Sequence, residues 1–336
     1  MSSERAFVDQ ACAQALFDAL PAEMQWPTLS PAYVAADALR DSQLAPVFLV
    51  SQEDDGLLMH GVHEAHVPGL EARDWQSAYG YGGPIVHHMN AEALTRAWRR
   101  LDAEATVRHV VAEFVRFHPA LENHHFYPGT VFADRAVVVI NLDTADLLSS
   151  YKGRARTAIR KAERAGLQVS FETQEHAIEI FPAFYRRCMG EIDADNFYLF
   201  SDAYFEHMLR LPGARVLSVS DGEKRLSMGL FLFGPKQAEY HLSGTLRAGR
   251  QSGATNLLVH AAAQTAQSSG CLSLYLGGGT SMRPDDPLLR FKESFAAAHL
   301  MFRFGHRIHD PATYARLREG APQLAANSKR LLFYRG

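Results

Sequence analysis

The stretch HLSGTLRAGRQSGATNLLVHAAAQ, His241–Gln264, decides the fold. A strand-like run ends near Leu246, a loop containing glycine and arginine follows, and a strongly apolar helix begins near Thr255. Gly249 and Gly253 let the backbone turn tightly and approach a ligand. Because the first N–H groups of a helix carry the positive end of its dipole, this arrangement can bind an anion such as a pyrophosphate. On these residues alone, a plain strand–loop–helix connection without a ligand explains the pattern equally well.

A second glycine-containing stretch, YLGGGTSMRPDDPLLRFKESFA, runs from Tyr275 to Ala296. It is not a P-loop, because no Gly-Lys-Ser/Thr follows the glycines and Pro284 and Pro287 disfavour immediate helix continuation. The glycines therefore end a strand, and a turn-rich loop leads to Lys292 between two phenylalanines. A lysine held there could stabilise a phosphate or a developing oxyanion. The alternative is a surface lysine beside core phenylalanines.

The composition limits the class of protein. A length of 336 residues favours about two domains, and 47% hydrophobic with 21% charged residues is typical of a globular protein. The net charge of -3 excludes a global basic field for nucleic acid, although local patches stay open. The three cysteines form no CxxC pair, which argues against a disulfide framework or a zinc knuckle. The polar N-terminus and the lack of long apolar runs predict a cytoplasmic protein with no membrane span.

Both halves of the chain mix helical and strand-like segments. Ala45–Gln52 and Gly56–Val67 predict a hairpin, because a turn signal separates two strand-like runs. Ala91–Ala105 predicts a helix, and further strands and helices follow without a strict βαβα alternation. The expected fold class is therefore α/β (α+β), with two lobes that each have a mixed central sheet flanked by helices and that join near residue 150.

The first stretch also resembles the pyrophosphate-binding segment of the GNAT acyltransferases, which reads Gln/Arg-x-x-Gly-x-Gly/Ala. In this chain Arg250 and Gly253 match the first and fourth positions, and the sixth is Thr255. The surrounding order of motifs resembles the FemAB-like branch of that fold, which includes the peptidoglycan-bridge enzymes. The matching segments run from about residue 45 to 305. They are Tyr240-x-x-Ser243-Gly244, Asn256-Leu-Leu, the glycine-ended strand, Phe291-Lys292-x-x-Phe295, YKGRARTAIRKAERAG, YGGP at Tyr81–Pro84 and RFHP at Arg116–Pro119.

This resemblance implies a transferase with two GNAT-like domains, residues 1–150 and 151–336. It implies movement of an acyl group from acyl-CoA or aminoacyl-tRNA to an amine of a cell-envelope precursor or amino sugar, without a metal. The partial Arg-x-x-Gly-x-Thr match keeps a second hypothesis open, namely a non-catalytic GNAT-like protein that binds a nucleotide or a partner. Oligomeric state does not follow from the sequence.

The candidate site residues fall into three sets. The donor-binding candidates are Arg250, Gly253, Ala254, Thr255 and Asn256. The catalytic candidates are Lys292, His241 and His118; either histidine could relay a proton or be a hydrogen-bonded core residue. The substrate-binding candidates are Tyr81, Gly82, Gly83, Asp195, Asn196, Tyr198 and Ser243. The loop around Asp195 could accept hydrogen bonds from an amine or simply cap the next helix.

A basic helix is expected from Tyr151 to Gly166. It holds six basic residues and one acidic residue, a net charge of +5, with alanines and Ile159 on the opposite face. The candidate polyanion-binding residues are Lys152, Arg156, Arg160 and Arg164. The partner would be a tRNA backbone or the phosphates of a nucleotide-sugar or lipid precursor; a solvated face is the alternative.

His60, His63 and His66 do not predict a metal site. On a strand, a three-residue spacing alternates faces, so the three rings cannot converge on one ion.

Overall fold

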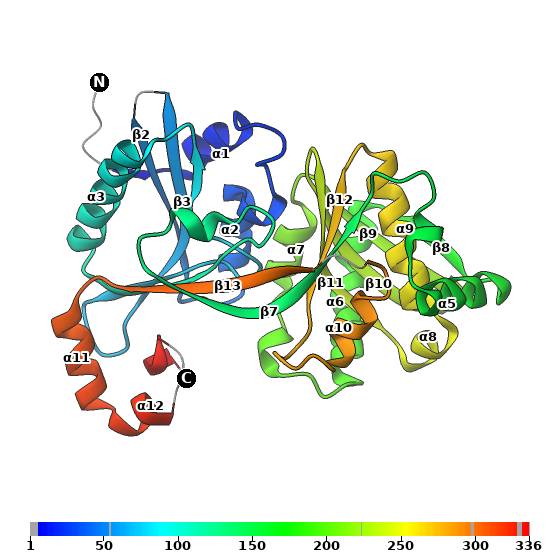
Figure 1. Ribbon diagram of the computed structural model, residues 1–336. Helices are drawn as coiled ribbons and strands as arrows, with labels where there is room; N and C mark the ends of the chain where they lie inside the picture. The colour runs from blue at the N-terminus through cyan, green and yellow to red at the C-terminus, as the bar shows by residue number, and fades with distance from the viewer. Residues whose placement is uncertain (1–5, 54, 223, 297–298, 328–330, 336) are drawn as a thin grey trace. The chain divides into compact units, whose positions relative to one another are not determined.

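The computed structural model describes residues 6–53, 55–222, 224–296, 299–327 and 331–335 (Figure 1). The chain forms two compact units. Unit 1 comprises the residues up to Leu20, Thr28–Asp134 and the segment from Phe302 onward, and unit 2 comprises Pro21–Pro27 and Arg135–Met301. This division differs from the expected boundary at residue 150. The C-terminal segment returns to unit 1, because β13 (His299–Ile308) pairs with β6 (Val110–Arg116).

Unit 1 is built on a mixed sheet with the strand order β1-β2-β3-β4-β6-β13, and β5 pairs with β3. Its strands are β1 (Phe7–Val8), β2 (Ala45–Glu53), β3 (Gly56–His66), β4 (Arg73–Gln76), β5 (Ile85–His87), β6 and the part of β13 from Phe302. Its helices are α1 (Gln10–Asp18), η1 (Pro27–Leu29, of which Pro27 belongs to unit 2), α2 (Pro31–Ala38), α3 (Ala91–Val107), η2 (Asn123–Phe126), α11 (Pro311–Gly320), α12 (Pro322–Asn327) and η4 (Phe333–Arg335). The β2–β3 hairpin and helix α3 agree with the sequence-based expectation.

The strands of unit 2 pair in the order β7-β12-β11-β10-β9-β8, again with both parallel and antiparallel neighbours. Its strands are β7 (Thr130–Asn141, in unit 2 from Arg135), β8 (Gln168–Glu172), β9 (Ala214–Asp221), β10 (Lys224–Phe233), β11 (Gln237–Thr245) and β12 (Ser273–Gly278). Its helices are α4 (Leu147–Ser150), α5 (Gly153–Arg164), α6 (Gln174–Gly190), η3 (Asn196–Tyr198), α7 (Asp202–Leu209), α8 (Arg247–Ser252), α9 (Ala254–Ser268) and α10 (Pro287–Lys292). The predicted fold class, a mixed sheet flanked by helices in each lobe, is confirmed.

Helices cover both faces of the unit 2 sheet (Figure 1). Thr245 on β11 contacts Thr255 of α9 on one face, whereas a side chain on its neighbour Gly244 would meet Cys188 of α6 on the other. Successive residues of a strand point to opposite faces. The sheet is therefore sandwiched, with α9 and α5 on one side and α6 with α7 on the other. The buried stripe of α5, formed by Ala155, Ile159 and Ala162, packs into the core on the α9 side.

Candidate functional site

The central strands of the unit 2 sheet separate from each other. β11 and β12 run parallel and pair only at three positions, from Gln237 opposite Ser273 to Glu239 opposite Tyr275. Beyond these pairs, β11 continues to Thr245 along β10, while β12 continues to Gly278 along β7. The facing edges of the two strands are not paired with each other over this second half. Such an opening offers backbone donors and acceptors to an extended ligand.

A β-bulge lies where the strands part. Phe231 of β10 is opposite Tyr240, but Leu230 is opposite Leu242, so His241 is the extra residue. Bulges re-aim side chains and are common beside active sites. The His241 ring makes a hydrogen bond of 3.0 Å, through Nε2, with the hydroxyl of Tyr204 on α7.

On the other face of β11, the hydroxyl of Tyr240 is hydrogen-bonded to that of Ser243. Polar side chains therefore stand on both faces of the strand that borders the opening.

Lys292 lies beside this opening. Its Nζ donates to the carbonyl oxygen of Gly278, at the end of β12, over 2.8 Å, and lies 6.0 Å from the centre of the Tyr240 ring on β11. The residue is only 8% exposed. Burial lowers the pKa of this amine to about 8, although the negative charge of Asp286 acts in the opposite direction. The Lys292 amine thus lies between the end of β12 and Tyr240 of β11, and burial makes it easier to deprotonate than an ordinary lysine.

The burial of Lys292 excludes the alternative of a surface lysine that the sequence left open. The lysine is the last residue of helix α10, which begins at Pro287. Leu289 and Phe295 are buried in the core on either side of it. Because these two buried apolar residues fix the position of the segment, the aliphatic part of the Lys292 side chain is buried as well.

The glycine-rich stretch before α10 encloses a carboxylate of the chain itself. The Asp286 side chain accepts hydrogen bonds from the backbone N–H groups of Thr280, Ser281, Leu288 and Leu289 and from the hydroxyls of Thr280 and Ser281. Burial disfavours the charged form, but these donors outweigh it and hold the pKa of Asp286 well below its usual range. Gly279 leaves the room that this carboxylate occupies. The stretch therefore forms an aspartate-centred turn that positions Lys292.

The expected donor-binding loop is largely helical. Residues 247–252 form α8, and Gly253 joins α8 to α9 with a left-handed φ of +85°. A Cβ atom at Gly253 would lie 2.5 Å from the carbonyl oxygen of Ala158 on α5. Gly253 and Ala254 are buried, and Thr255 and Asn256 are half-buried. Helix α5 thus packs closely against the beginning of α9, which gives Gly253 a structural role of its own.

Arg250, the candidate phosphate contact, is held by groups of the protein. Its guanidinium donates to the carbonyl oxygen of Thr245 over 2.9 Å and forms an ion pair of 3.3 Å with Glu191. The same carboxylate accepts the backbone N–H of Arg247 over 2.8 Å. A phosphate that approached Arg250 would compete with Glu191 for this cation.

The basic helix exposes most of its charge. Lys152, Arg160 and Arg164 are exposed, while Arg156 is half-buried. The Arg156 guanidinium donates to the carbonyl oxygens of Ser149 and Tyr151. Arg156 therefore stabilises the start of α5, and the other three candidates are available to solvent.

The loop between α6 and α7 carries three substrate candidates. The Asp195 carboxylate accepts the backbone N–H of Phe197 over 2.8 Å and caps η3, which is the alternative that the sequence left open. Asn196 is exposed and Tyr198 is half-buried.

The remaining candidates, Tyr81, Gly82, Gly83 and His118, lie in unit 1. The ring of Tyr81 packs edge-on against the fully buried His118 at 5.2 Å. Gly83 has a left-handed φ of +91°, and a Cβ there would lie 2.8 Å from the Phe117 ring. These contacts make the Tyr81–Gly83 segment part of a closely packed corner.

Unit 1 has no opening like that of unit 2 among its described residues. Its parallel pair is β4 with β6. Beyond β4, the N–H of Ser77 donates to the carbonyl oxygen of Phe114, and the N–H of Gly82 donates to that of Arg116. The chain after β4 thus continues the pairing with β6 and fills the place where the two strands would part.

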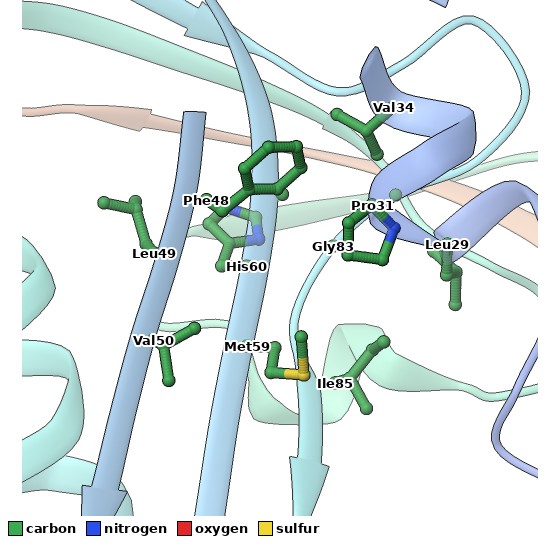
Figure 2. A pocket seen from close by; sticks show the side chains of 12 residues that line it. Leu29, Pro31, Val34, Phe48, Leu49, Val50, Met59, His60, Gly83 and Ile85 are labelled. Atoms are coloured by element: carbon green, nitrogen blue, oxygen red, sulfur yellow. The ribbon is translucent and has the colours of Figure 1, made fainter. Parts of the chain in front are cut away.

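A small cavity in unit 1 is lined by apolar residues and by Gly82 and Gly83 (Figure 2). Its volume is about 20 Å³, which holds roughly one water molecule and not a sugar. Figure 2 shows His60 among the lining side chains. Nε2 of His60 pairs with the carboxylate of the buried Glu113. His63 points to the opposite face of the strand, where its Nε2 is hydrogen-bonded to the carbonyl oxygen of Val34.

Among the described residues, no group of three or more His, Cys, Asp or Glu side chains is arranged to hold a metal ion. In the same residues, no helix has the length and apolar character needed to cross a bilayer.

The segment that contains the β11–β12 opening and α9 matches the family model for the acetyltransferase (GNAT) domain over residues 149–286. Residues 149–286 are therefore similar in sequence to the GNAT acetyltransferase domain. The search of curated proteins gave no match.

Solved structures extend the likeness to both units. FemX has a TM-score of 0.70 at 14% identity, over 92% of this chain and 98% of FemX. The C-terminal domain of a putative lysylphosphatidylglycerol synthetase from Agrobacterium fabrum has a TM-score of 0.58 at 14% identity, over 96% and 99% of the two chains. L-PGS from Bacillus licheniformis has a TM-score of 0.60 at 13% identity, over 94% and 97%. At these identities the likeness shows the fold.

The match to the GNAT domain and the fold shared with FemX confirm the expected resemblance to FemAB-like GNAT acyltransferases. They agree with an N-acyltransferase enzyme whose GNAT domain lies in the second half of the chain. Within that half, sequence reasoning singled out Lys292 and His241, which border the opening. It missed the role of Asp286, although an aspartate before a proline is a typical helix start. Tyr204 gave no local signal, because its contact with His241 is long-range.

Proposed function

We propose that the protein transfers an acyl or aminoacyl group to an amine of a cell-envelope precursor or amino sugar, and that the reaction takes place at the β11–β12 opening of unit 2. The observation that carries this proposal is the buried Lys292 amine at the point where the two strands part. The GNAT domain supports an acyl-CoA donor. Aminoacyl-tRNA is the alternative donor, favoured by the fold shared with a putative lysylphosphatidylglycerol synthetase, whose name joins an aminoacyl group to a lipid.

The proposed chemistry is direct attack of a neutral amine on the donor carbonyl. The new C–N bond forms as the C–S bond of a thioester, or the C–O bond of an ester, breaks. The Lys292 ammonium and backbone N–H groups of β11 stabilise the negative oxygen of the tetrahedral intermediate. His241, hydrogen-bonded to Tyr204, takes the proton that the amine loses, directly or through water.

The donor and acceptor contacts are proposed on the same basis. The donor phosphates would lie at the start of α9, held by Gly253, Ala254, Thr255, Asn256 and Arg250. Arg250 would then leave its ion pair with Glu191 and bind a phosphate instead. Ser243, Asp195, Asn196 and Tyr198 are proposed contacts of the acceptor. From the resemblance alone, Tyr81, Gly82 and Gly83 are proposed as substrate-binding residues and His118 as a proton relay. Cytoplasmic localisation stays a prediction.

Acyl transfer can be tested directly. The protein is incubated with acetyl-CoA or with charged tRNA and a panel of amines that includes amino sugars and nucleotide-linked muropeptides, and products are identified by mass spectrometry. Lys292→Met should reduce turnover by about two to three orders of magnitude, the range for loss of one oxyanion donor. Lys292→Arg should restore only part of it, because the planar guanidinium does not fit a point-charge site.

The exposed Lys236 in the same unit provides the matched control. Lys236→Met should keep wild-type turnover. A folded Lys292→Met variant with wild-type turnover would remove the lysine from the mechanism.

A further inference from the structure

Lys292 is chemically the same kind of group as the acceptor that the proposed reaction needs, namely a primary amine. Of the five lysines that the structure describes, Lys152, Lys161, Lys224 and Lys236 are exposed, and Lys292 is buried. Its Nζ is held by the backbone carbonyl of Gly278, and no described carboxylate forms an ion pair with it. The charge of Asp286 favours the ammonium form of this amine, but burial outweighs that effect.

We propose that Lys292 is itself an acylation site: a donor whose carbonyl enters the β11–β12 opening transfers its acyl group to the Lys292 amine when no other amine is bound. This inference rests on the proposed function, because it takes the opening as the place of the donor carbonyl. It goes beyond that function, because the product is a covalently modified protein.

Burial makes the required form of the amine accessible. An ordinary lysine has a pKa near 10.4, so at pH 8 it is almost entirely an ammonium without a lone pair. The pKa of Lys292 is lowered to about 8 by burial, so close to half of it is neutral at that pH. The neutral fraction is then roughly a hundred times that of a solvated lysine.

The step balances without a further reagent. The lone pair of Nζ attacks the donor carbonyl carbon and forms an amide C–N bond. The C–S bond of a thioester or the anhydride C–O bond of an acyl phosphate breaks, and the thiolate or phosphate leaves. The nitrogen loses one proton to solvent.

The product changes the site in a defined way. An acylated lysine carries no charge, so it cannot stabilise the oxyanion that the ammonium would stabilise. Incubation with donor alone should therefore reduce later turnover in step with modification of Lys292. A free amine acceptor should protect the enzyme, because it consumes the bound donor first.

Peptide mass mapping tests the proposal cleanly, because the chain has only six lysines. The wild-type protein is incubated at pH 8 with acetyl-CoA, and separately with acetyl phosphate, a small donor without a nucleotide. Acetylation of each lysine is followed over time after digestion with a protease that does not cut at lysine. With either donor, Lys292 should be acetylated at least roughly tenfold faster than Lys152 and Lys236, given its larger neutral fraction.

The pH dependence and two controls complete the test. The rate at Lys292 should level off above about pH 8, while the rate at the exposed lysines keeps rising toward pH 10. Unfolding in guanidinium should abolish the difference between sites. Lys292→Arg should show no loss of its residual turnover on incubation with donor.

The outcomes separate this inference from the proposed function. If Lys292 reacts no faster than Lys236 with both donors, self-acylation is wrong, even if transfer to free amines is observed. If Lys292 is acetylated selectively but no amine acceptor is found, self-acylation stands and the proposed transfer to envelope amines does not.

Discussion

Lys292 combines two effects of burial that can be measured separately, one on folding and one on chemistry. Bringing an ammonium into an apolar site costs free energy, whereas the same site makes its charge more effective on a nearby oxyanion. We therefore expect the buried Lys292 ammonium to lower the stability of the folded protein and to raise the rate of acyl transfer. Removal of the charge should therefore move the two properties in opposite directions.

We predict that Lys292→Met is more stable than the wild type at pH 7, by roughly 1–3 kcal/mol. The folded-state pKa of about 8 lies below the ordinary value of 10.5, so the folded protein binds this proton less tightly than the unfolded chain. The penalty is present in full below about pH 8 and disappears as pH rises toward 10.5. Urea unfolding of both proteins between pH 7 and 10.5 measures it. A constant difference across this range would mean that the amine is solvated in the folded state.

At the scale of elements, the turn between β12 and α10 is organised by the Asp286 carboxylate. Six hydrogen bonds converge on it from both ends of the turn. Asp285, its neighbour, is exposed and forms an ion pair with Arg283. Asp286 therefore supports the fold of the turn, whereas the carboxylate of the adjacent Asp285 is solvated.

Asp286→Asn should destabilise unit 2 by roughly 2–4 kcal/mol, because an amide group must face several N–H donors and loses the charge that they stabilise. Asp285→Asn should change stability by no more than about 0.5 kcal/mol. Thermal melting at neutral pH compares them. Since hydrogen bonding lowers the pKa of Asp286, its contribution is present above the ordinary aspartate range and is lost as pH falls through the folded-state value. Equal melting temperatures for the two variants would show that the turn does not depend on this carboxylate.

The junction of α8 and α9 gives a second element-scale prediction. Gly253→Ala should lower stability by roughly 2–4 kcal/mol, because φ is +85° and the new Cβ would meet the carbonyl oxygen of Ala158. Gly270 has a similar φ of +83° but nothing within 4 Å of a Cβ. Gly270→Ala should therefore lose only about 1–2 kcal/mol. Similar losses from chemical denaturation of both variants would show that α5 does not pack tightly on this junction.

At the scale of the whole molecule, sequence reasoning succeeded where the signal is local. The β2–β3 hairpin, α3, α5 and α9 follow from periodicity and turn residues within each segment. The return of the chain to unit 1 through β13 was missed, because it depends on pairing with β6 almost 200 residues earlier. The choice between a buried and a surface Lys292 stayed open in the sequence for the same reason, because burial requires β11, β12 and α10 to meet.

The exposed charge of α5 predicts binding to a polyanion. Replacing Lys152, Arg160 and Arg164 with glutamine should weaken binding to charged tRNA and reduce the slope of log affinity against log salt by up to about 2–3, close to one unit per lost phosphate contact. Replacing Arg210, Arg215 and Lys224, which are also exposed, removes the same charge elsewhere in unit 2. Fluorescence anisotropy at several salt concentrations compares the two triple variants. An equal effect of both would mean that only net charge matters and that α5 is a solvated face.

The most direct test of the account is amide hydrogen exchange of the whole protein during titration with acetyl-CoA and, in parallel, with aminoacyl-tRNA. If the donor lies between the parted strands, at least one of these ligands should slow exchange in residues 240–245 of β11 and 275–278 of β12. The β4–β6 region of unit 1 should be unaffected. Saturable binding of either donor without protection of these two segments would contradict the placement of the acyl-transfer site.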